Sequence, residues 1–163
     1  MEIREAVPGD AEGIQRVARQ AWHDVYDGRL GKQGVEQMID EWYGLEQLRD
    51  SIETETHPLF VASGDEIVGF AQGGSSEDGP ADAVVSRIYV LPAHWGEGIG
   101  TALLNRLFNT FRSDGYESVW LSVWTENDIG RSFYDTHGFK IEENRTTEFA
   151  GQEIEEIVLV REL

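Results

Sequence analysis

The segment from Ile88 to Leu104 constrains the fold more than any other part of this sequence. A short apolar run ends at Pro92, and a loop with three glycines, Gly96, Gly98 and Gly100, leads directly into a helical pattern. Such a strand–loop–helix unit turns bare backbone N–H groups toward the positive end of a helix dipole, where phosphate groups bind. We therefore expect this unit to hold a phosphorylated cofactor.

The composition bounds the class of protein. At 163 residues the chain is long enough to bury a proper core, and we expect residues 1–163 to form a single domain. The absence of cysteine excludes disulfides and thiolate metal sites. No apolar run approaches the roughly 20 residues that span a bilayer, and Met1 to Glu5 lack the features of an export signal. A cytoplasmic location is therefore expected.

The charge of the chain is strongly negative. There are 31 acidic residues against 13 lysines and arginines, a formal net charge of −18. Nucleic acids and anionic membranes bind proteins through cationic contacts, so neither is an expected partner. Because the acids are spread along the whole chain, we interpret them as a general adaptation to a salt-rich, halophilic cytoplasm, where salt screens self-repulsion.

Hydrophobic periodicity predicts alternating strands and helices. Expected strands are 3–6, 58–63, 67–73, 83–91, 118–125, 140–149 and 153–161. A helix is expected after Asp10, its candidate N-cap, and one or two more between 35 and 52, beyond a glycine-broken segment. Two further helices are expected, from the glycine loop to Asp114 and from Asp128 to His137. The last two strands form a hairpin around Ala150-Gly151, giving a mixed α/β sandwich that is neither doubly wound nor all-helical.

Two classes of glycine loop fit the segment poorly. A nucleoside-triphosphate loop ends in Gly-Lys-Ser/Thr, whose lysine neutralises phosphate charge, but Gly100 is followed by Thr101 and Ala102. The dinucleotide fingerprint has three glycines, of which Gly96 and Gly98 supply two, while Thr101 takes the third place. A nucleotide-binding Rossmann unit is therefore the weaker alternative.

Two motifs, in the right order, resemble those of the GNAT family of acetyltransferases. The loop Trp95-Gly96-Glu97-Gly98-Ile99-Gly100 is similar to the family's acyl-CoA loop, Gln/Arg-x-x-Gly-x-Gly/Ala, with Trp95 in the Gln/Arg place. The segment from Asn127 to Phe139 is similar to the family's Asn-x-x-Ala-x-x-Phe-Tyr-x-x-x-Gly-Phe motif, with Gly130 in place of alanine. The resemblance covers most of the chain and is sharpest from Ile88 to Phe139.

The resemblance implies an α/β (mixed α+β) fold of the GNAT type. Its central sheet is mixed but mostly antiparallel, has about six or seven strands and is flanked by helices, and a splayed strand pair forms the acyl-CoA cleft. It implies an acetyl-CoA-dependent N-acetyltransferase, with acetyl-CoA as cosubstrate and no metal. The acetyl group would pass to a primary amine of a small molecule or protein, by direct attack through a tetrahedral intermediate.

The resemblance also implies roles for individual residues. The main chain of the glycine loop would hold the cofactor's diphosphate, and Asn127 would touch the pantetheine arm. The Val90 N–H would donate to the acetyl carbonyl, and Tyr134 would be the general acid for the departing thiolate. The catalytic candidates are thus Tyr134 and Val90. The expected cofactor-binding residues are Ile88, Tyr89, Val90, Trp95, Gly96, Glu97, Gly98, Ile99, Gly100, Thr101, Asn127 and Tyr134.

Each of these roles has a structural alternative. Ile88 and Val90 also suit an ordinary core strand, Tyr134 suits core packing, and either Asn127 or Thr125 could cap the following helix. The general base stays open, with four candidates that are also plausible surface groups: Asp24, Tyr26, Ser86 and Glu126. Four aromatic residues suit either the core or one wall of the acceptor cleft: Trp22, Tyr26, Trp42 and Tyr43.

The partners follow from the same considerations. Apart from acetyl-CoA, the acceptor is an unidentified amine, and the edges of the late hairpin would permit a homodimer. No metal is expected, because His23, His57, His94 and His137 are scattered without ligand spacing. The alternative to an enzyme is a non-catalytic acyl-CoA-binding regulatory module, which would keep the loop without turnover.

Overall fold

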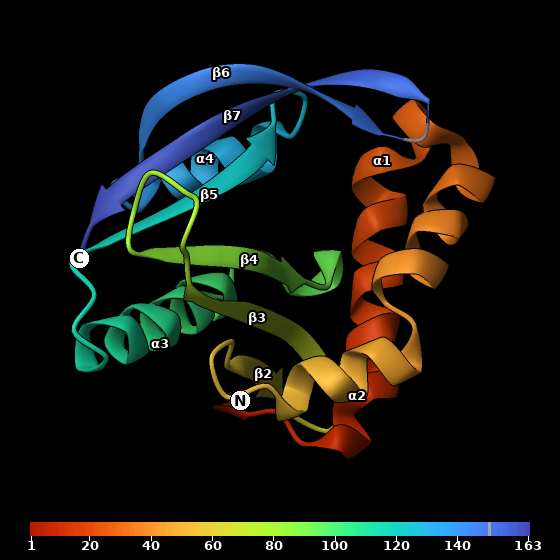
Figure 1. The fold of residues 1–163 in the computed structure, drawn as a ribbon. Helices are drawn as coiled ribbons and strands as arrows, with labels where there is room; N and C mark the ends of the chain where they lie inside the picture. Colours follow the sequence, from red (N-terminus) through yellow and green to blue (C-terminus); the bar gives the residue numbers. More distant parts are fainter. Residues whose placement is uncertain (150) are drawn as a thin grey trace.

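The computed structural model describes residues 1–149 and 151–163, and its centre is a seven-stranded sheet in the order β1-β2-β3-β4-β5-β7-β6 (Figure 1). All neighbouring strands are antiparallel except β4 and β5. The strands are β1 (Glu2–Glu5), β2 (Leu59–Ser63), β3 (Ile67–Ser75), β4 (Ala83–Val90), β5 (Ser118–Trp124), β6 (Lys140–Phe149) and β7 (Gln152–Glu162). They confirm the mixed, mostly antiparallel sheet expected. The turn expected at Ala150-Gly151 lies partly outside the described residues.

A glycine divides the first helix into two halves. The helices are α1 (Ala11–Trp42), α2 (Leu45–Glu53), α3 (Ile99–Ser113) and α4 (Asp128–Thr136), with short 3₁₀ turns at Pro8–Asp10 and Pro92–His94. Within α1, Gly31 has φ 76° and ψ 159°, a conformation that other residues rarely adopt. The chain therefore doubles back, and the two halves lie side by side (Figure 1). This confirms the glycine-broken segment and the separate helix expected after it.

The helices cover both faces of the sheet. A Cβ on Gly69 of β3 would lie 3.2 Å from Leu103 of α3. The next residue, Phe70, meets Tyr43 at the end of α1 with ring centroids 6.1 Å apart. Because successive residues of a strand point to opposite faces, α1 and α3 pack on opposite sides. The apolar stripe of α3 is fully buried, as its periodicity predicts: Leu103, Leu104, Leu107, Phe108 and Phe111.

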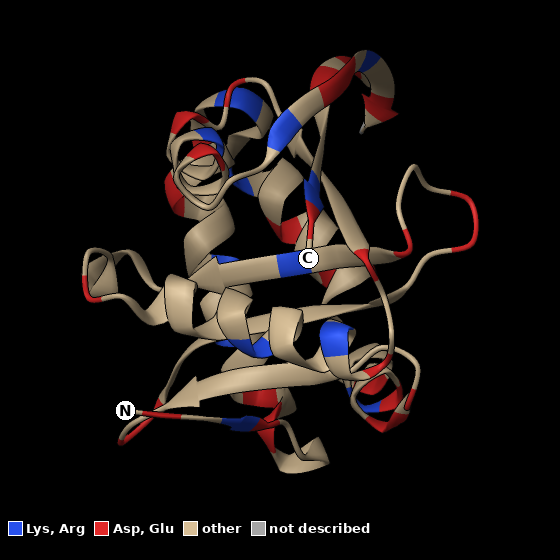
Figure 2. Ribbon diagram, turned by 90° about the vertical axis from the view of Figure 1, so that its left-hand side faces the viewer, with Lys and Arg blue, Asp and Glu red and all other residues tan. Residues whose placement is uncertain are grey.

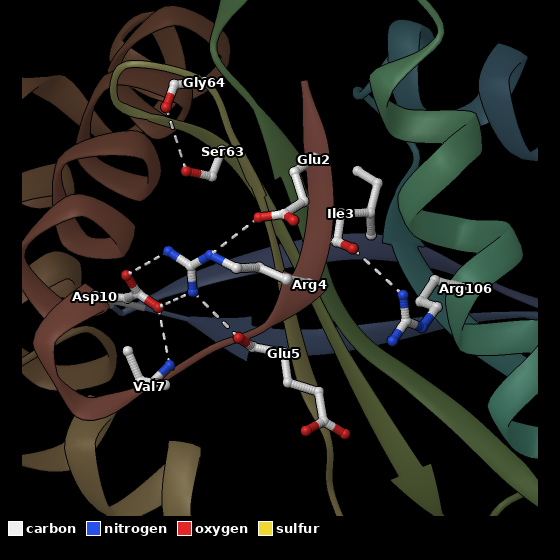
Figure 3. Close-up of polar contacts among 9 residues, drawn as sticks. All are labelled: Glu2, Ile3, Arg4, Glu5, Val7, Asp10, Ser63, Gly64 and Arg106. Atoms are coloured by element: carbon white, nitrogen blue, oxygen red, sulfur yellow. Dashed lines mark hydrogen bonds and ion pairs between the residues drawn. The ribbon is translucent and has the colours of Figure 1, made fainter.

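Asp10 stands at the N-cap position of α1 but does not cap it through its side chain. Figure 3 shows Arg4 donating to both carboxylate oxygens of Asp10, at 2.8 and 3.0 Å. The Val7 N–H donates to the same carboxylate at 2.8 Å. The hydrogen bonds from Arg4 hold the pKa of Asp10 below its ordinary value. The expected capping role is therefore wrong, because the arginine of β1 takes the carboxylate.

His23 ties the two halves of α1 together. Its Nδ1 lies 2.6 Å from Oδ1 of Asp27, and its Nε2 lies 2.6 Å from Oε2 of Glu36. Carboxylates only accept hydrogen bonds, so both ring nitrogens must donate and the ring is an imidazolium. Burial lowers the pKa of His23, but the bonds to Glu36 and Asp27 outweigh it and raise the pKa. Arg19 also donates to Glu36, at 3.1 Å.

This contact predicts a pH-dependent stability. A raised folded-state pKa gives stabilisation that is complete below the unfolded value of about 6.5 and is lost as the pH rises through the folded value. We expect the Tm gap between wild type and His23→Gln to be a few degrees at pH 6 and to shrink toward pH 9, since about 1 kcal/mol shifts Tm by about 2–4 °C. Thermal unfolding from pH 6 to 9 measures it. His57→Gln, which loses only a bond to Thr56, is the control; a gap independent of pH contradicts the assignment.

The acidic residues do not gather at one place. In Figure 2 they appear on helices and loops around the whole visible face. The net charge of −18 is therefore not concentrated in a single acidic patch on this face. Among the described residues, no helix combines the length and apolarity needed to cross a bilayer.

Candidate active site

A cleft of about 1150 Å³ opens where β4 and β5 part. The two strands pair only through Ala83 with Val119 and Val84 with Trp120. In Figure 1, β5 rises away from β4 beyond these pairs and runs alongside β7. The splayed pair expected from the family resemblance is confirmed, and it leaves the second half of β4 with a free edge on this side.

The free edge of β4 presents the backbone of Ile88 and Val90. Leu91, just after the strand, donates its N–H to the Val68 carbonyl at 2.8 Å, so its polar groups face β3. Because these groups alternate along an antiparallel strand, those of Val90 and Ile88 face the cleft. The indole N–H of Trp95 donates to the Val90 carbonyl at 2.9 Å. The Val90 N–H is thus aimed at the opening, where its expected role requires it.

The glycine loop forms an open cradle at the N-terminus of α3. Gly96 has φ 82° and Gly98 has φ 81°, both in the left-handed region that favours glycine. Apart from the adjoining residues of the chain, no atom of the described residues lies within 4 Å of a Cβ built on either glycine. Six loop residues line the cleft: Trp95, Gly96, Gly98, Ile99, Gly100 and Thr101. Glu97 is outside this lining set and lies 3.2 Å from Nδ1 of His94, so only its backbone stays a candidate for cofactor binding.

Asn127 both caps α4 and lines the cleft. Its Oδ1 accepts the Gly130 N–H at 2.9 Å, and its Nδ2 donates to the Tyr26 hydroxyl at 3.4 Å. Thr125, the rival for the cap, instead donates its N–H to the Glu155 carbonyl of β7. The capping alternative is therefore confirmed for Asn127 and wrong for Thr125. Capping α4 does not test the expected contact of Asn127 with pantetheine, which stays a prediction.

Tyr134 lies on α4 and faces the same cleft. Its ring packs against Phe133 and Phe139, with centroids 5.4 and 5.6 Å away. Burial, and to a smaller extent the neighbouring Tyr26, raise the pKa of Tyr134 above its ordinary value. The phenol therefore stays protonated at any working pH and can donate a proton or a hydrogen bond.

A contact that the sequence did not indicate joins α4 to α3. Nδ1 of His137 lies 2.7 Å from the Phe133 carbonyl, and its Nε2 lies 3.0 Å from the Thr101 hydroxyl. The Phe133 ring also closes on α3, because a Cβ on Gly100 would meet it at 3.2 Å. The helix that carries Tyr134 is thus fixed to the first turn of the glycine-loop helix. No spacing rule relates residues 101 and 137, so this contact could not be predicted.

The aromatic residues of α1 divide between core and cleft. Trp22, Tyr26 and Tyr43 are buried, in agreement with the core alternative. Trp42 is 46% exposed, so a core role for it is wrong. All four line the cleft, because α1 doubles back and brings residues 42 and 43 beside residues 22 and 26.

Two aromatic residues from distant strands complete this wall. Trp124, at the end of β5, packs on Tyr26 with centroids 4.6 Å apart. Phe149 of β6 packs on Trp42 at 4.9 Å and on Trp124 at 5.0 Å. We call Trp22, Tyr26, Trp42, Trp124 and Phe149 the aromatic wall. Sequence analysis missed Trp124 and Phe149, and their only signal was an aromatic ring at each strand's end.

The candidates for a general base separate by position. Asp24 and Glu126 are absent from the cleft lining, whereas Ser86 and Tyr26 belong to it. Burial raises the pKa of Tyr26 to about 12, so its phenolate is scarce at neutral pH. Three unexpected carboxylates line the cleft: Glu41, Glu148 and Glu156. In the described part of the chain, no three metal-ligating side chains converge.

The sequence analysis also missed a positively charged residue of the cleft, Arg87. It lines the cleft from β4, two residues before Tyr89. A signal was present, because Arg87 is the one charged residue in the strand Ala83–Val90. Gln72 lines the cleft beside it and is only 4% exposed.

Comparison with known proteins places this geometry in a family. The sequence profile of the acetyltransferase (GNAT) family matches residues 19–139. The chain is 28% identical over 154 residues to a spermidine N(1)-acetyltransferase of Thermoplasma acidophilum, covering 91% of this chain and 94% of that protein. An uncharacterized N-acetyltransferase of Mycobacterium tuberculosis is 26% identical over 155 residues, or 94% and 98% of the two chains. The crystal structure of the PaiA N-acetyltransferase of T. acidophilum with coenzyme A superposes with a TM-score of 0.86, at 26% identity and 99% and 98% coverage.

Proposed function

This chain belongs to the GNAT family of acetyltransferases and is an acetyl-CoA-dependent N-acetyltransferase, and we propose that it acetylates the primary amine of a small molecule by direct attack. The observation that carries the proposal is the free edge of β4, which faces both the glycine-loop cradle and the aromatic wall. Residues 1–163 would act as one domain. A single cleft would thus admit the thioester from one side and the amine from the other.

The residues present suit acetyl-CoA. The open cradle at Gly96 and Gly98 leaves room for a diphosphate against the backbone N–H groups that begin α3. The free edge of β4 offers pantetheine amides a strand to pair with. All the expected cofactor-binding residues except Glu97 line this one cleft. Their roles in binding remain part of the proposal.

The proposed reaction follows from where the donors lie. The neutral amine attacks the thioester carbon while the Val90 N–H donates to the carbonyl oxygen, which becomes negative in the tetrahedral intermediate. The carbon–sulfur bond then breaks, and the Tyr134 phenol gives its proton to the departing sulfur. The amine loses its proton to solvent or to a cleft carboxylate, and the acetamide forms.

Contacts beside the aromatic wall, and one of the similar proteins, support a small acceptor over a protein. Arg29, next to the turn of α1, donates to the Glu153 carbonyl of β7 at 3.0 Å. It also lies 3.6 Å from Glu126 in the loop before α4. These contacts join α1 to the C-terminal half of the sheet beside the aromatic wall. The spermidine acetyltransferase similar to this chain supports a small-molecule acceptor as well.

Release of free thiol from acetyl-CoA tests the proposal. The panel comprises polyamines, amino acids, aminoglycosides and peptides, each at several concentrations, with CoA affinity measured in parallel. We expect release with at least one small amine and slower release with peptides. Tight CoA binding without release from any amine would instead support a non-catalytic acyl-CoA-binding module.

The surroundings of the enzyme are a separate proposal. We propose a salt-rich cytoplasm, because the acidic residues are spread over many elements rather than gathered in one segment (Figure 2). Lowering KCl from molar to millimolar is then expected to lower Tm, since self-repulsion among the charges is no longer screened. A Tm that stays flat over this range contradicts the proposal. A homodimer through the edge strand β6 is also proposed, and sedimentation velocity tests it.

A further inference from the structure

We propose that the amine acceptor carries a carboxylate, and that Arg87 receives it on the α1 side of the cleft. The inference rests on the proposed acetyl transfer and names the class of its acceptor. We call Arg87, Trp22, Tyr43 and Tyr89 the donor cluster. All four line the cleft, and each carries an N–H or O–H group.

Arg87 is held by neutral groups alone. Its Nε donates to Oε1 of Gln72 at 2.9 Å, its Nη1 to the Trp42 carbonyl at 3.2 Å, and its Nη2 to the Ser51 hydroxyl at 3.2 Å. The buried Gln72 amide is fixed in turn by Ser51, at 2.7 Å. The guanidinium also lies over the Tyr43 ring, with Cζ 5.0 Å from the centroid. The side chain is thus anchored, yet two of its five N–H donors remain free.

Six arginines have no acidic partner among the described residues, and Arg87 is the one of them that lines the cleft. Acidic residues outnumber lysines and arginines by 31 to 13. Among the described residues, no carboxylate oxygen comes within 4.0 Å of the Arg87 guanidinium, although Arg4, Arg19 and Arg145 all have one. A partly desolvated cation without a counter-charge is costly unless an anion arrives. The acceptor enters this cleft, so we expect the missing anionic group to belong to the acceptor.

Trp22 is the other N–H donor of the donor cluster, and it is buried. It is 4% exposed, and its indole N–H donates to nothing among the described residues. This N–H lies close to the hydroxyls of Tyr43 and Tyr89, where it opposes part of the rise that burial causes in their pKa values. Because the indole nitrogen has almost no exposed surface, an entering carboxylate would meet Arg87 rather than Trp22.

The position of the donor cluster suits an α-amino acid. Tyr89 is the residue before Val90, whose N–H is expected at the acetyl carbonyl. A carboxylate held beside Tyr89 would therefore leave an amine on the adjacent carbon close to the β4 edge. The acceptor's side chain would then meet the aromatic wall, which includes the exposed ring of Trp42. The structure thus favours an amino acid with an apolar or aromatic side chain.

The aromatic wall is poorly suited to enclosing a cation. Its rings pack on one another at 4.6 to 6.3 Å, which occupies much of their faces. Of the cleft carboxylates, Glu156 is already paired with Arg145 at 2.6 Å. Glu41 and Glu148 have exposed side chains, so solvent and salt weaken their attraction for a cation. A polyamine would also have to approach Arg87, a like charge.

Three amines that differ only at the carboxylate test the inference: L-phenylalanine, L-phenylalaninamide and 2-phenylethylamine. We expect the wild-type kcat/KM to be at least about ten-fold higher for L-phenylalanine than for the other two, mainly through KM. Arg87→Gln is expected to remove this preference by raising KM for L-phenylalanine alone. The Kd for CoA, measured by calorimetry, should stay unchanged.

Two further variants separate recognition from folding. Arg106→Gln is the matched control, because Arg106 also lies over an aromatic ring, Phe60 at 4.8 Å, and donates to a backbone carbonyl outside the cleft. It should leave the preference intact. Ser51→Ala removes a support of Arg87 without removing the cation, so it should lower the preference only in part. If Arg87→Gln does not fold, Arg87→Lys should weaken the preference, since an ammonium lacks the bidentate fork.

The outcomes are distinct. Equal kcat/KM for the three wild-type reactions, or a preference for spermidine that Arg87→Gln strengthens, overturns the carboxylate inference and leaves the acetyl transfer standing. Absence of thiol release from every amine, despite CoA binding, removes the proposed function and this inference with it. A preference that survives Arg87→Gln overturns the role of Arg87.

Discussion

Replacing Tyr134 by phenylalanine is expected to lower kcat about ten-fold or more while the affinity for acetyl-CoA stays nearly unchanged. General acid catalysis typically contributes about 10²–10⁴-fold, and water can replace part of it in an open cleft. The ring packs between Phe133 and Phe139, so phenylalanine keeps these contacts and removes only the hydroxyl. The loss should therefore appear in kcat, because the hydroxyl acts on the sulfur only as the carbon–sulfur bond breaks.

The measurement is steady-state thiol release beside the calorimetric Kd for CoA. Burial raises the pKa of Tyr134, so the wild-type rate should not fall at alkaline pH through ionisation of this phenol. Tyr116→Phe is the matched control: Tyr116 packs on Phe111 at 6.2 Å and is absent from the cleft lining. An unchanged kcat in Tyr134→Phe would remove this residue from the mechanism.

Gly98→Ala is expected to weaken CoA binding more than ten-fold. Gly98 is the N-cap residue of α3, with φ 81° and ψ 8°. Alanine in this left-handed region costs about 1–2 kcal/mol, which the loop relieves by turning its N–H groups away from the diphosphate. Its methyl group would also enter the open cradle, where no described atom lies within 4 Å. A ten-fold change corresponds to about 1.4 kcal/mol of binding free energy.

Gly115→Ala isolates the effect of the cradle from that of backbone strain. Gly115 has φ 88°, and a Cβ there also meets no described atom within 4 Å. It follows α3 at the end remote from the glycine loop. Both alanine variants should lose a similar amount of stability in thermal unfolding, and only Gly98→Ala should lose CoA affinity. Equal affinities in the two variants would contradict a diphosphate site in this loop.

Much of the fold could be read from local signals. The break in α1 was predicted from glycines and the burial of α3 from its apolar spacing, because helices and glycine turns are specified by nearby residues. The strands deviate from their expected bounds by a few residues at most, as β3 shows by continuing through Gly74 to Ser75. Asp10 was misjudged because its partner, Arg4, lies on β1 rather than in the helix.

The acceptor side of the site could not be read in the same way. The aromatic wall collects rings from both halves of α1, from the end of β5 and from β6. Arg87 is the one charge in its strand but was passed over, and the proposed binding of an anion depends on Gln72, Ser51 and Trp42 occupying its other donors. No sequence spacing encodes such contacts between distant elements.

The glycine-loop cradle at the start of α3 could be predicted from the residues alone because it is local: a run of glycines before a helix dictates where backbone N–H groups point. Three features are visible only in the tertiary structure. They are the divergence of β4 from β5 after two residue pairs, the return of α1 upon itself and the contact of α4 with α3 through His137. They depend on which side chains fill the space between elements, and packing at that distance is a property of the whole core.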